Sequence, residues 1–469
     1  MAATGIAVCT QFNTTYPSFT LTPSTTSATS LFFMHIGLTL MEAGVIRSKN
    51  VTNTFIKNIL NFFVVALAYW AVGYAFAFGM ESNVFIGYRN WFSENMPVGA
   101  YTGWAYHFLL CAIVVAIATS SLAERGEFMA YPIFAFILAA FVYPISTHWA
   151  WHIKGWLYAG ADGVGFRDDG GSGVVFVTAG AAALVAAVFV GPRHGRFDNE
   201  DGQPIPIRAH STPFVGLGAL LIMLGFMGMT PTVTLMNLFL AATGGAIVAV
   251  ILRKFGMCGQ NGCCRGYETD NFSWGLLTIV NGAICGMVAV VGTGHLMYPW
   301  SAFVTGTVAG IAYCTWSFVS VTIKVDDPLD TVAVYLGGGF WGLMAGPLFS
   351  TVCGVVWSNQ DTFQQTARWL GWNMLGGVAF LAWASLLCVL LFGILKCLRL
   401  LRVNHEVQAR GLDVVIHRER AYPPEAYLDM DPTPYSDGSG SLSKPHKLGR
   451  EAPQIGRDPS PRRRGYPYY

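Results

Sequence analysis

The sequence predicts an all-α polytopic membrane protein with eleven transmembrane helices, the first ten of which form two inverted five-helix repeats. Of its 469 residues, 53% are hydrophobic and only 12% are charged, whereas a soluble domain carries roughly 25% charged residues. The apolar residues gather into long runs, and a helix needs about 20 of them to cross the hydrocarbon core of a membrane. Composition and run length together therefore favour lipid, rather than water, as the solvent.

Eleven apolar runs follow one another along the chain. They cover residues 29–46, 54–79, 103–122, 130–148, 173–190, 213–229, 234–252, 273–291, 299–321, 331–348 and 370–395. An odd number of spans places the two termini on opposite sides of the membrane. Because the first ten divide into two groups of five, the second group inserts upside down relative to the first. Such an inverted repeat places its site near mid-membrane, between the halves.

The basic residues of the loops predict the orientation, since cytoplasmic loops carry an excess of Lys and Arg. One set of loops contains only Arg89, Lys154, Arg167 and Arg368. The other set contains Arg47, Lys49, Arg125, Arg193, Arg196, Arg208, Arg253, Lys254, Arg265 and Lys324. We therefore expect the N-terminus outside and the C-terminus in the cytoplasm. Asn13 begins an Asn-Thr-Thr glycosylation sequon in the outer arm, which agrees with this orientation.

The composition changes at both ends of the hydrophobic part. We expect an extracellular arm over residues 1–28, the transmembrane part over 29–396, a cytoplasmic regulatory segment over 397–428 and a disordered tail over 429–469. The tail is rich in Pro, Ser, Gly and Arg and is too polar to bury a core. The net charge of +2 gives no reason to expect a nucleic-acid partner. Membrane topology and contact with anionic lipid explain the basic loops.

The sequence does not predict an enzyme. It shows neither a nucleophile with a matching base nor a cluster of metal ligands, so we expect no cofactor and no metal site. Cys258, Cys263 and Cys264 share one cytoplasmic loop without a second set of Cys or His to complete a zinc site. Cys9 and Cys353 are both expected outside, where the compartment permits a disulfide.

Several short stretches resemble the ammonium transporter, methylammonium permease and Rhesus family, and most of all its animal and plant ammonium transporter branch. They are Gly37 to Asn50 (GLTLMEAGVIRSKN), Ala123-Glu124-Arg125, the acidic stretches that begin at Asp168 and Asp326, and the C-terminal pattern Gly411-Leu412-Asp413…His417…Ala421-Tyr422. The resemblance implies the ammonium-transporter fold and ammonium or ammonia as the substrate. It also implies a plasma-membrane homotrimer with one pore in each subunit, and a C-terminal segment that leans on the neighbouring subunit.

The resemblance further implies an outer ammonium site built on Trp151 and Asp168. An indole face attracts ammonium through a cation–π interaction of roughly 2 kcal/mol when desolvated. We expect Asp168 to cap the following helix rather than to touch the ion. The alternative for Trp151 is an interfacial residue of the aromatic belt. Thr230 matches a family position whose hydroxyl helps to hold the ion.

Below that site the family stacks two phenylalanine rings as a gate. The first position falls on Leu110 here, with Tyr106 one turn above it. The second is kept as Phe226, for which simple core packing is the alternative. At the pore centre the family usually carries two histidines that share a hydrogen bond, and this chain has Phe176 and Tyr335 in their places.

This exchange at the pore centre changes the expected chemistry. Phenylalanine does not titrate, and a phenol with a reference pKa near about 10 is a poor base at neutral pH. The sequence therefore predicts no proton relay through Phe176 and Tyr335, and the two rings add bulk to a narrow channel. His35 and His107 also lie inside spans, but a lone buried histidine is more often a packed, satisfied residue.

Two functions stay open at this point. The first is an ammonium or ammonia transporter with a redesigned conduit, which the outer-site residues, Phe226 and the hydroxyl of Thr230 favour. The second is a non-conducting or weakly conducting homologue that acts as a sensor, signalling or interaction protein. The loss of both central histidines and of one gate phenylalanine favours this second function.

Overall fold

The computed structural model describes residues 24–161, 163–198, 200–255, 275–358 and 360–423 of the chain. Asn13, Cys9, the three loop cysteines at 258, 263 and 264, and the tail expected over residues 429–469 lie outside these ranges. Within them the secondary structure is helical, with isolated β-bridges between loops. The predicted all-α class is confirmed for this part of the chain.

The first half of the fold contains five apolar helical segments. Two of them pass through a wide, π-helical turn in mid-course, and the fifth begins with one. In chain order the elements are α2 (Thr25–Val45), α3 (Val51–Ala68) with η2 (Tyr69–Gly73) and α4 (Tyr74–Phe78), α5 (Tyr101–Ser120), α6 (Ala130–Ile137) with η5 (Leu138–Val142) and α7 (Tyr143–Trp151), the short α8 (Trp156–Ala159), and η6 (Ser172–Val177) with α9 (Thr178–Val190).

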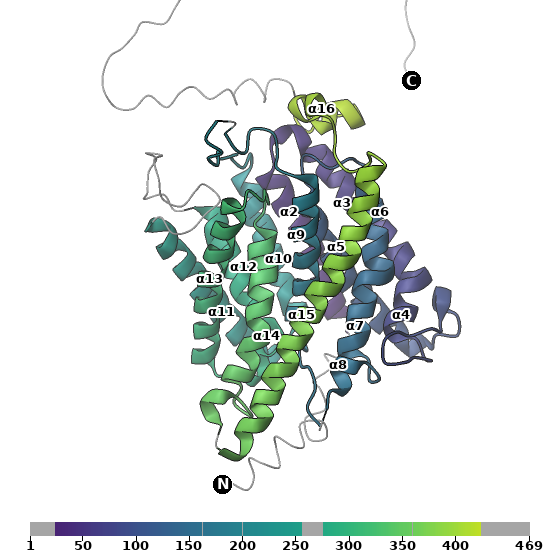
Figure 1. Cartoon of the computed structure of the whole chain (residues 1–469), viewed down its shortest axis with the longest axis vertical. Helices are drawn as coiled ribbons and strands as arrows, with labels where there is room; N and C mark the ends of the chain where they lie inside the picture. Colours follow the sequence, from purple (N-terminus) through teal and green to yellow (C-terminus); the bar gives the residue numbers. More distant parts are fainter. Residues whose placement is uncertain (1–23, 162, 199, 256–274, 359, 424–469) are drawn as a thin grey trace, which may run out of the picture. The chain divides into compact units, whose positions relative to one another are not determined.

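The second half repeats this order and is followed by one long helix, α15, which crosses the face seen in Figure 1. Its elements are α10 (Thr212–Met229), α11 (Leu235–Lys254), α12 (Leu276–Val291), α13 (Pro299–Thr322), η9 (Val332–Gly337) with α14 (Gly338–Phe349), and α15 (Gln360–Cys397). Ten helices among the described residues are long and apolar enough to cross a membrane. Because α12, the eighth expected span, is shorter, at 16 described residues, the count of eleven stays a prediction.

Two of the helices that begin earlier than the sequence predicts have a side chain that accepts N–H groups at their start. Helix α2 begins at Thr25 because the side chain of Ser24 accepts the backbone N–H of Ser27 at 3.0 Å. The last residues assigned to the outer arm are therefore helical. Helix α3 begins at Val51 because the carboxylate of Asp413, far along the chain, accepts the N–H groups of Thr52 and Asn53 at 3.1 and 2.8 Å.

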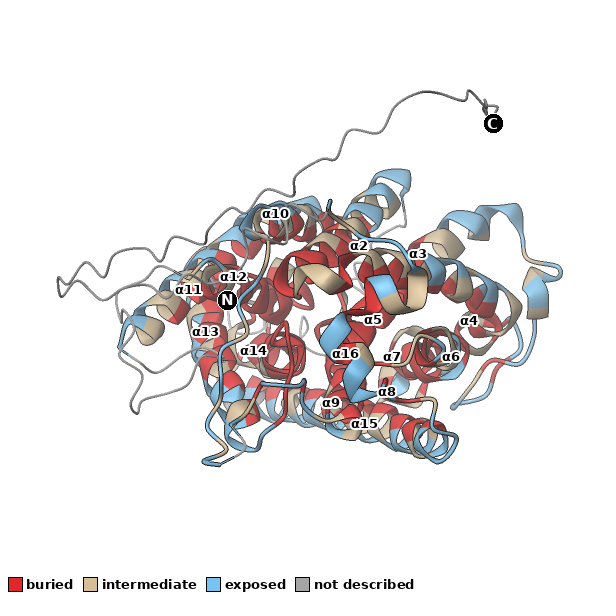
Figure 2. Cartoon of the chain, turned by 90° about the horizontal axis from the view of Figure 1, so that it is seen from above, coloured by how far each residue is buried: buried red, intermediate tan, exposed pale blue. Residues whose placement is uncertain are grey.

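The helices pack through small residues, both between the halves and within the second half. A Cβ placed on Gly37 of α2 would lie 2.6 Å from the carbonyl oxygen of Gly218 on α10, so these backbones touch. Gly245 of α11 meets Gly282 of α12 at 2.2 Å in the same test. Small residues permit this close approach between membrane helices. Seen from above in Figure 2, buried residues fill the interior of the bundle and exposed ones face outward.

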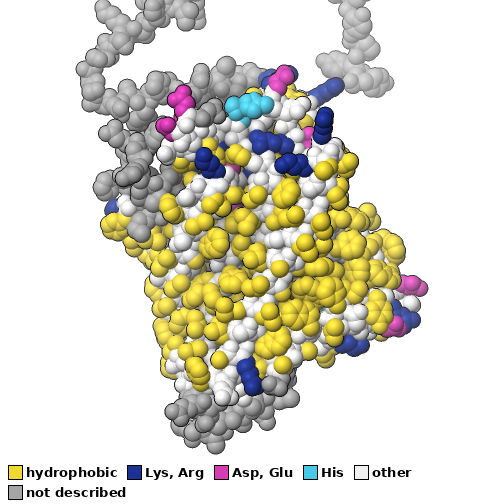
Figure 3. All heavy atoms as spheres, in the orientation of Figure 1, with side chains coloured by type: hydrophobic (Ala, Val, Ile, Leu, Met, Phe, Trp, Pro, Cys, Tyr) yellow, Lys and Arg dark blue, Asp and Glu magenta, His cyan; other side chains and the backbone are white. Residues whose placement is uncertain are grey.

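The outer surface has the distribution that a lipid-embedded protein needs. Figure 3 shows a broad band of hydrophobic side chains over the middle of the visible face, with Lys and Arg side chains gathered at the end where α16 (His405–Arg410) lies. Large apolar side chains are widely exposed, among them Leu220 at 66% and Phe63 at 63%. Exposure of so much apolar surface is unfavourable in water and is typical of contact with acyl chains.

The C-terminal segment docks on its own chain. Arg402 donates to the carbonyls of Val190 and Pro192, both at 2.7 Å, and the N–H of Val403 donates to the carbonyl of Arg125 at 3.1 Å. Further on, η11 (Asp413–His417) lies on the start of α3. The contact with a neighbouring subunit, implied by resemblance, stays a prediction.

Candidate functional site

Asp168 organises the start of the fifth span. Its carboxylate accepts four backbone N–H groups, from Gly171 at 3.0 Å, Ser172 at 2.7 Å, Gly173 at 2.7 Å and Val174 at 3.0 Å. Gly171 adopts the left-handed conformation (φ 88°), which glycine tolerates and which folds the chain around the carboxylate. Burial raises the pKa of Asp168 to about 6, although these backbone hydrogen bonds lower it. The predicted cap is confirmed.

Trp151 is fixed to the same acidic residue. At the end of α7, its indole N–H donates to the backbone carbonyl of Asp168 at 2.8 Å. The partly buried indole lies beside the ring of His107, with centroids 5.7 Å apart, and His107 in turn lies 4.4 Å from the ring of Phe78. The structure thus brings Trp151 and Asp168 together, and it adds His107 and Phe78 to their surroundings. No sequence signal distinguished Phe78 from the other aromatics of its span.

His148, one turn before Trp151, holds the end of α4 and the loop after it with both ring nitrogens. Nδ1 lies 2.8 Å from the carbonyl oxygen of Ala77 and Nε2 lies 2.9 Å from that of Asn83. The fully buried ring thus ties α7 to α4 and to the loop that follows α4. A histidine next to an expected site is too common a pattern to predict these two carbonyl contacts.

The expected gate residues occupy two helices. Tyr106 and Leu110 lie buried on one face of α5, at 6% and 1% exposure. Phe226, near the end of α10, is fully buried. The hydroxyl of Thr230 donates to the carbonyl of Phe226 at 3.3 Å. Among the described residues, no hydrogen bond or ring contact joins Thr230 to Trp151, so the three expected outer-site residues are not brought into one contact set.

At the centre the two halves meet through a stack of three rings. The Phe176 ring lies 5.6 Å from that of Tyr335 with an interplanar angle of 14°, and 5.5 Å from that of Phe226. Phe176 lies on the wide turn η6 and Tyr335 on its counterpart η9. The two rings are thus in direct contact, and the correspondence of their positions in the two halves stays a prediction. Wide π turns are frequent at functional sites.

A small cavity lies on the far side of this stack, where α5 ends. Its empty volume is about 310 Å³, and Tyr335 forms part of its wall together with polar residues such as Ser120, Asn281 and Thr331. Leu38 and Met41 of α2 line the same cavity. A mainly apolar space with a few polar side chains therefore lies against Tyr335.

A second acidic stretch opens the tenth span and does different work. Asp326 accepts three N–H groups of Arg193, with Nε at 2.8 Å and Nη2 at 3.0 Å, while Arg193 Nη1 reaches Glu124 at 3.3 Å. Burial raises the pKa of Asp326, but Arg193 and Arg125 outweigh it and hold that pKa well below its usual range. Asp327 accepts the N–H of Val332 and the hydroxyl of Thr331, both at 2.8 Å.

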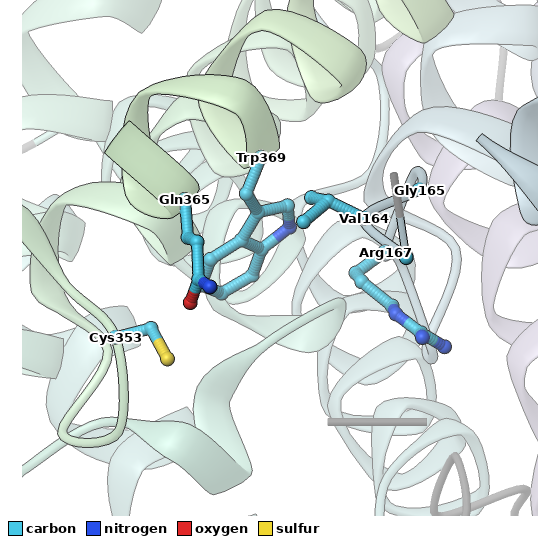
Figure 4. Close-up of a pocket in the computed structure, with 7 residues that line it drawn as sticks. Val164, Gly165, Arg167, Cys353, Gln365 and Trp369 are labelled. Carbon is cyan, nitrogen blue, oxygen red and sulfur yellow. The ribbon is translucent and has the colours of Figure 1, made fainter. Parts of the chain in front are cut away.

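A separate pocket, shown in Figure 4, is formed mainly by the loop before Asp168 and the start of α15. Its empty volume is about 360 Å³, and the indole of Trp369 lies beside the amide of Gln365 in its wall. Cys353, also in the wall, is disulfide-bonded. None of the predicted site residues lines this pocket.

Comparison with known proteins places the whole transmembrane part in one family. A profile described as "Ammonium Transporter Family" matches residues 24–422. The chain is 34% identical to "Putative ammonium transporter 1" of Caenorhabditis elegans over 85% of this chain and 77% of that protein. It is 32% identical to "Ammonium transporter 1 member 1" of Arabidopsis thaliana over 84% of this chain and 82% of that protein.

Solved structures agree on the fold. The "Sensor Amt Protein" superposes with a TM-score of 0.73 at 25% identity and covers 89% of this chain and 100% of its own. Mep2 of Saccharomyces cerevisiae gives a TM-score of 0.67 at 21% identity, with 81% and 86% covered. A capped wide turn in each half, a central contact between the halves and a family match over residues 24–422 lead to one conclusion: the chain belongs to the ammonium transporter family.

Proposed function

We propose that this chain moves ammonium or ammonia across the plasma membrane as a homotrimer, with its N-terminus outside and residues 397–428 in the cytoplasm. One observation carries the proposal. The indole of Trp151 is only partly buried and is held by the carbonyl of Asp168 at 2.8 Å, which leaves its π face for a cation. Ring faces attract ammonium most strongly where water is excluded. The relatives named above, which carry ammonium transporters' names, support the same substrate.

The conduit below this entrance differs in chemistry from a histidine-lined one. The central stack of Phe226, Phe176 and Tyr335 offers a single hydroxyl and no base for neutral pH. We propose that substrate passes this point without a proton relay between the two central side chains. Movement of the rings then limits the rate.

A second function has its own support. The same stack fills the centre of the bundle, and the buried cap at Asp168 keeps the outer site in place whether or not anything passes. An ammonium sensor with a closed conduit has these two features. The solved structure with a TM-score of 0.73 is itself titled a sensor protein, which supports this function for a chain of the same fold.

Uptake of methylammonium by a host without its own ammonium transporters tests the proposal. The full chain should raise uptake above that of the empty host, and Trp151→Ala should remove the increase at equal surface expression. Trp383→Ala is the matched control, because Trp383 is also a partly buried indole whose N–H donates to a helix carbonyl, at 3.2 Å from Val142. This control should keep uptake unchanged.

The two functions give different results in this experiment. Uptake that needs Trp151 supports transport. If uptake is absent but ammonium changes the accessibility of the C-terminal segment in the parent, and not in Trp151→Ala, the sensor is supported. An ammonium response of full strength in Trp151→Ala would remove the basis for the outer site.

A further inference from the structure

We propose that the interface of α2, α3 and α5 contains a buried site for small neutral molecules that donate hydrogen bonds, namely water or ammonia. The site lies beside an ion pair of Glu42 and Lys57 and is formed by Asn58, Asn61 and His35. It is separate from the conduit and from the outer site, and it depends on the membrane location of α2 and α3 rather than on transport.

A buried polar stripe runs along α3. Its members recur at intervals of three or four residues and therefore share one face of the helix. Each is at most 2% exposed: Asn50, Asn53, Thr54, Lys57, Asn58 and Asn61. Polar and ionisable residues inside a membrane span are costly, and they mark pathways and binding sites. The stripe faces the protein interior, because the exposed apolar side chains of the same helix, such as Phe63, lie on its other side.

The ion pair makes one end of the site electrically neutral. Lys57 Nζ lies 2.5 Å from one carboxylate oxygen of Glu42, and Asn58 Nδ2 donates to the other at 2.9 Å. Lys57 also lies over the ring of Tyr131, 5.2 Å from its centroid. The charges of Glu42 and Lys57 cancel, and the ammonium group of Lys57 repels a second cation. The neighbourhood therefore suits a neutral guest.

Four polar atoms beside this pair are buried and have no hydrogen-bond partner in the described protein. They are Asn58 Oδ1, both amide atoms of Asn61, and Nδ1 of His35. Asn58 and Asn61 are one turn apart on α3, and the ring of His35 lies 5.0 Å from that of Phe62, the residue after Asn61. The other ring nitrogen of His35 faces the backbone of Ala112 on α5. The four atoms thus belong to one turn of the α2–α3 contact.

The inventory of these atoms defines the ligand. With the far ring nitrogen of His35 donating to Ala112, Nδ1 is an acceptor, so the site offers three acceptors and one donor. A guest must therefore donate hydrogen bonds and accept at least one. Water and ammonia both have N–H or O–H donors and a lone pair, and both are small. Lipid offers no partner to these atoms, and buried polar groups are commonly satisfied by ordered water where protein partners are lacking.

The site and the cavity next to Tyr335 use different side chains of helix α2. Leu38 and Met41 line the cavity, whereas His35 and Glu42 contact α3. Position 38 lies between positions 35 and 42 on the same face of the helix, and position 41 lies about 120° from position 35. The chain that lacks a base for neutral pH in its central stack keeps a histidine and a glutamate on the helix that lines the neighbouring cavity.

High-resolution electron cryomicroscopy of the full chain in lipid nanodiscs tests the site directly. We expect density for small molecules within hydrogen-bond distance of Asn58 Oδ1, the Asn61 amide and His35 Nδ1. Asn61→Leu should remove the density next to residue 61, while Phe62→Leu, a change on the same turn that leaves the polar atoms in place, should keep it. A dry site in the parent would overturn the proposal.

Thermal unfolding supplies an independent measurement and distinguishes the two guests. If the amide of Asn61 holds a guest, Asn61→Leu should leave the melting temperature equal or lower. If its atoms are truly unpaired, the substitution should raise that temperature, which would also overturn the proposal. Added ammonium chloride should raise the parent's melting temperature more at pH 9 than at pH 6 if the guest is ammonia. That gain should be lost in Asn61→Leu and kept in Trp151→Ala. If the effect of ammonium chloride on the melting temperature does not depend on pH in this way, the guest is water.

Discussion

The acidic stretches that open the fifth and tenth spans have the same position in the two halves and do different chemistry. Asp168 gives its whole carboxylate to four backbone N–H groups and its carbonyl to the indole of Trp151. In the second half the work is divided. Asp327 caps the turn with one backbone N–H and one hydroxyl, and Asp326 anchors Arg193. The first stretch shapes a site, and the second fixes the opposite end of the bundle.

The difference is also visible in the charges. Burial keeps the pKa of Asp168 raised, to about 6, since no cation is paired with it. At Asp326 the guanidinium of Arg193 reverses the effect of burial, so that carboxylate stays ionised. An inverted repeat can thus keep its backbone geometry in both halves while one half specialises for ligand and the other for stability. Four experiments probe this division.

The largest effect should come from the charge network of the second stretch. Arg193→Ala removes the closest cation from the buried carboxylate of Asp326 and one of the two arginines that pair with buried Glu124. Removing one member of a buried pair costs about 3–5 kcal/mol, so we expect loss of the folded protein or a large fall in melting temperature. Fluorescence-detected gel filtration after heating measures this. Arg89→Ala breaks an exposed pair with Glu81 and should change almost nothing. Equal behaviour of the two variants would contradict the assignment.

Removing the two caps should separate the halves. Asp168→Ala frees four buried N–H groups and should cost about 2 kcal/mol, the upper end of the range for a helix cap. Asp327→Ala frees one N–H and one hydroxyl and should cost about 1 kcal/mol. Asp168→Asn keeps an acceptor and should fall between the parent and Asp168→Ala. Thermal unfolding of the purified protein in detergent checks the order, and a larger loss at Asp327 would reverse the comparison.

Restoring the family's central pair tests whether the stack limits passage. The double substitution Phe176→His with Tyr335→His replaces two six-membered rings by smaller imidazoles and supplies titratable nitrogens. Methylammonium uptake should therefore rise severalfold at equal surface expression. Phe176→Leu with Tyr335→Leu is the control, since it removes the stacked rings without adding a base. A gain in both variants would identify bulk as the limit, a gain in the histidine variant alone would identify the relay, and no gain in either would place the obstruction elsewhere, most plainly at Leu110.

The smallest effect concerns the docked segment. His405 Nε2 and His194 Nδ1 share a hydrogen bond of 2.6 Å on the exposed surface. Desolvation, and then the nearby His405, Arg47, Lys49 and Arg402, lower the pKa of His194. A lowered pKa means that docking is stabilised above the free value near about 6.5 and loses this contribution as the pH falls through the lowered pKa. Protease access to the segment should rise between pH 7.5 and 5, and His405→Gln should flatten that change.

The sequence predicted what depends on local pattern and repeat order. The acidic cap at Asp168 follows from an Asp placed before Gly-Gly-Ser, and the correspondence of Phe176 with Tyr335 follows from counting spans. Contacts between segments far apart in the chain could not be predicted from the sequence. No residue near Thr52 in the sequence predicts that Asp413 caps the helix of Thr52. The two carbonyls that face His148, and the pairing of Glu42 with Lys57, are set by how helices pack rather than by spacing along the chain.

Asp413 caps the first turn of α3. A partner protein that binds the C-terminal segment therefore competes with that helix for the Asp413 carboxylate. A protein that captures residues 411–417 must first take the carboxylate from Thr52 and Asn53, so its apparent affinity is reduced by the free energy of the cap. By thermodynamic reciprocity, anything that steadies the first turn of α3 weakens such a partner by the same factor. Lipid, guest molecules and cytoplasmic proteins that bind at the start of the polar stripe, at Asn50 and Asn53, then all shift the docking equilibrium of the C-terminal segment.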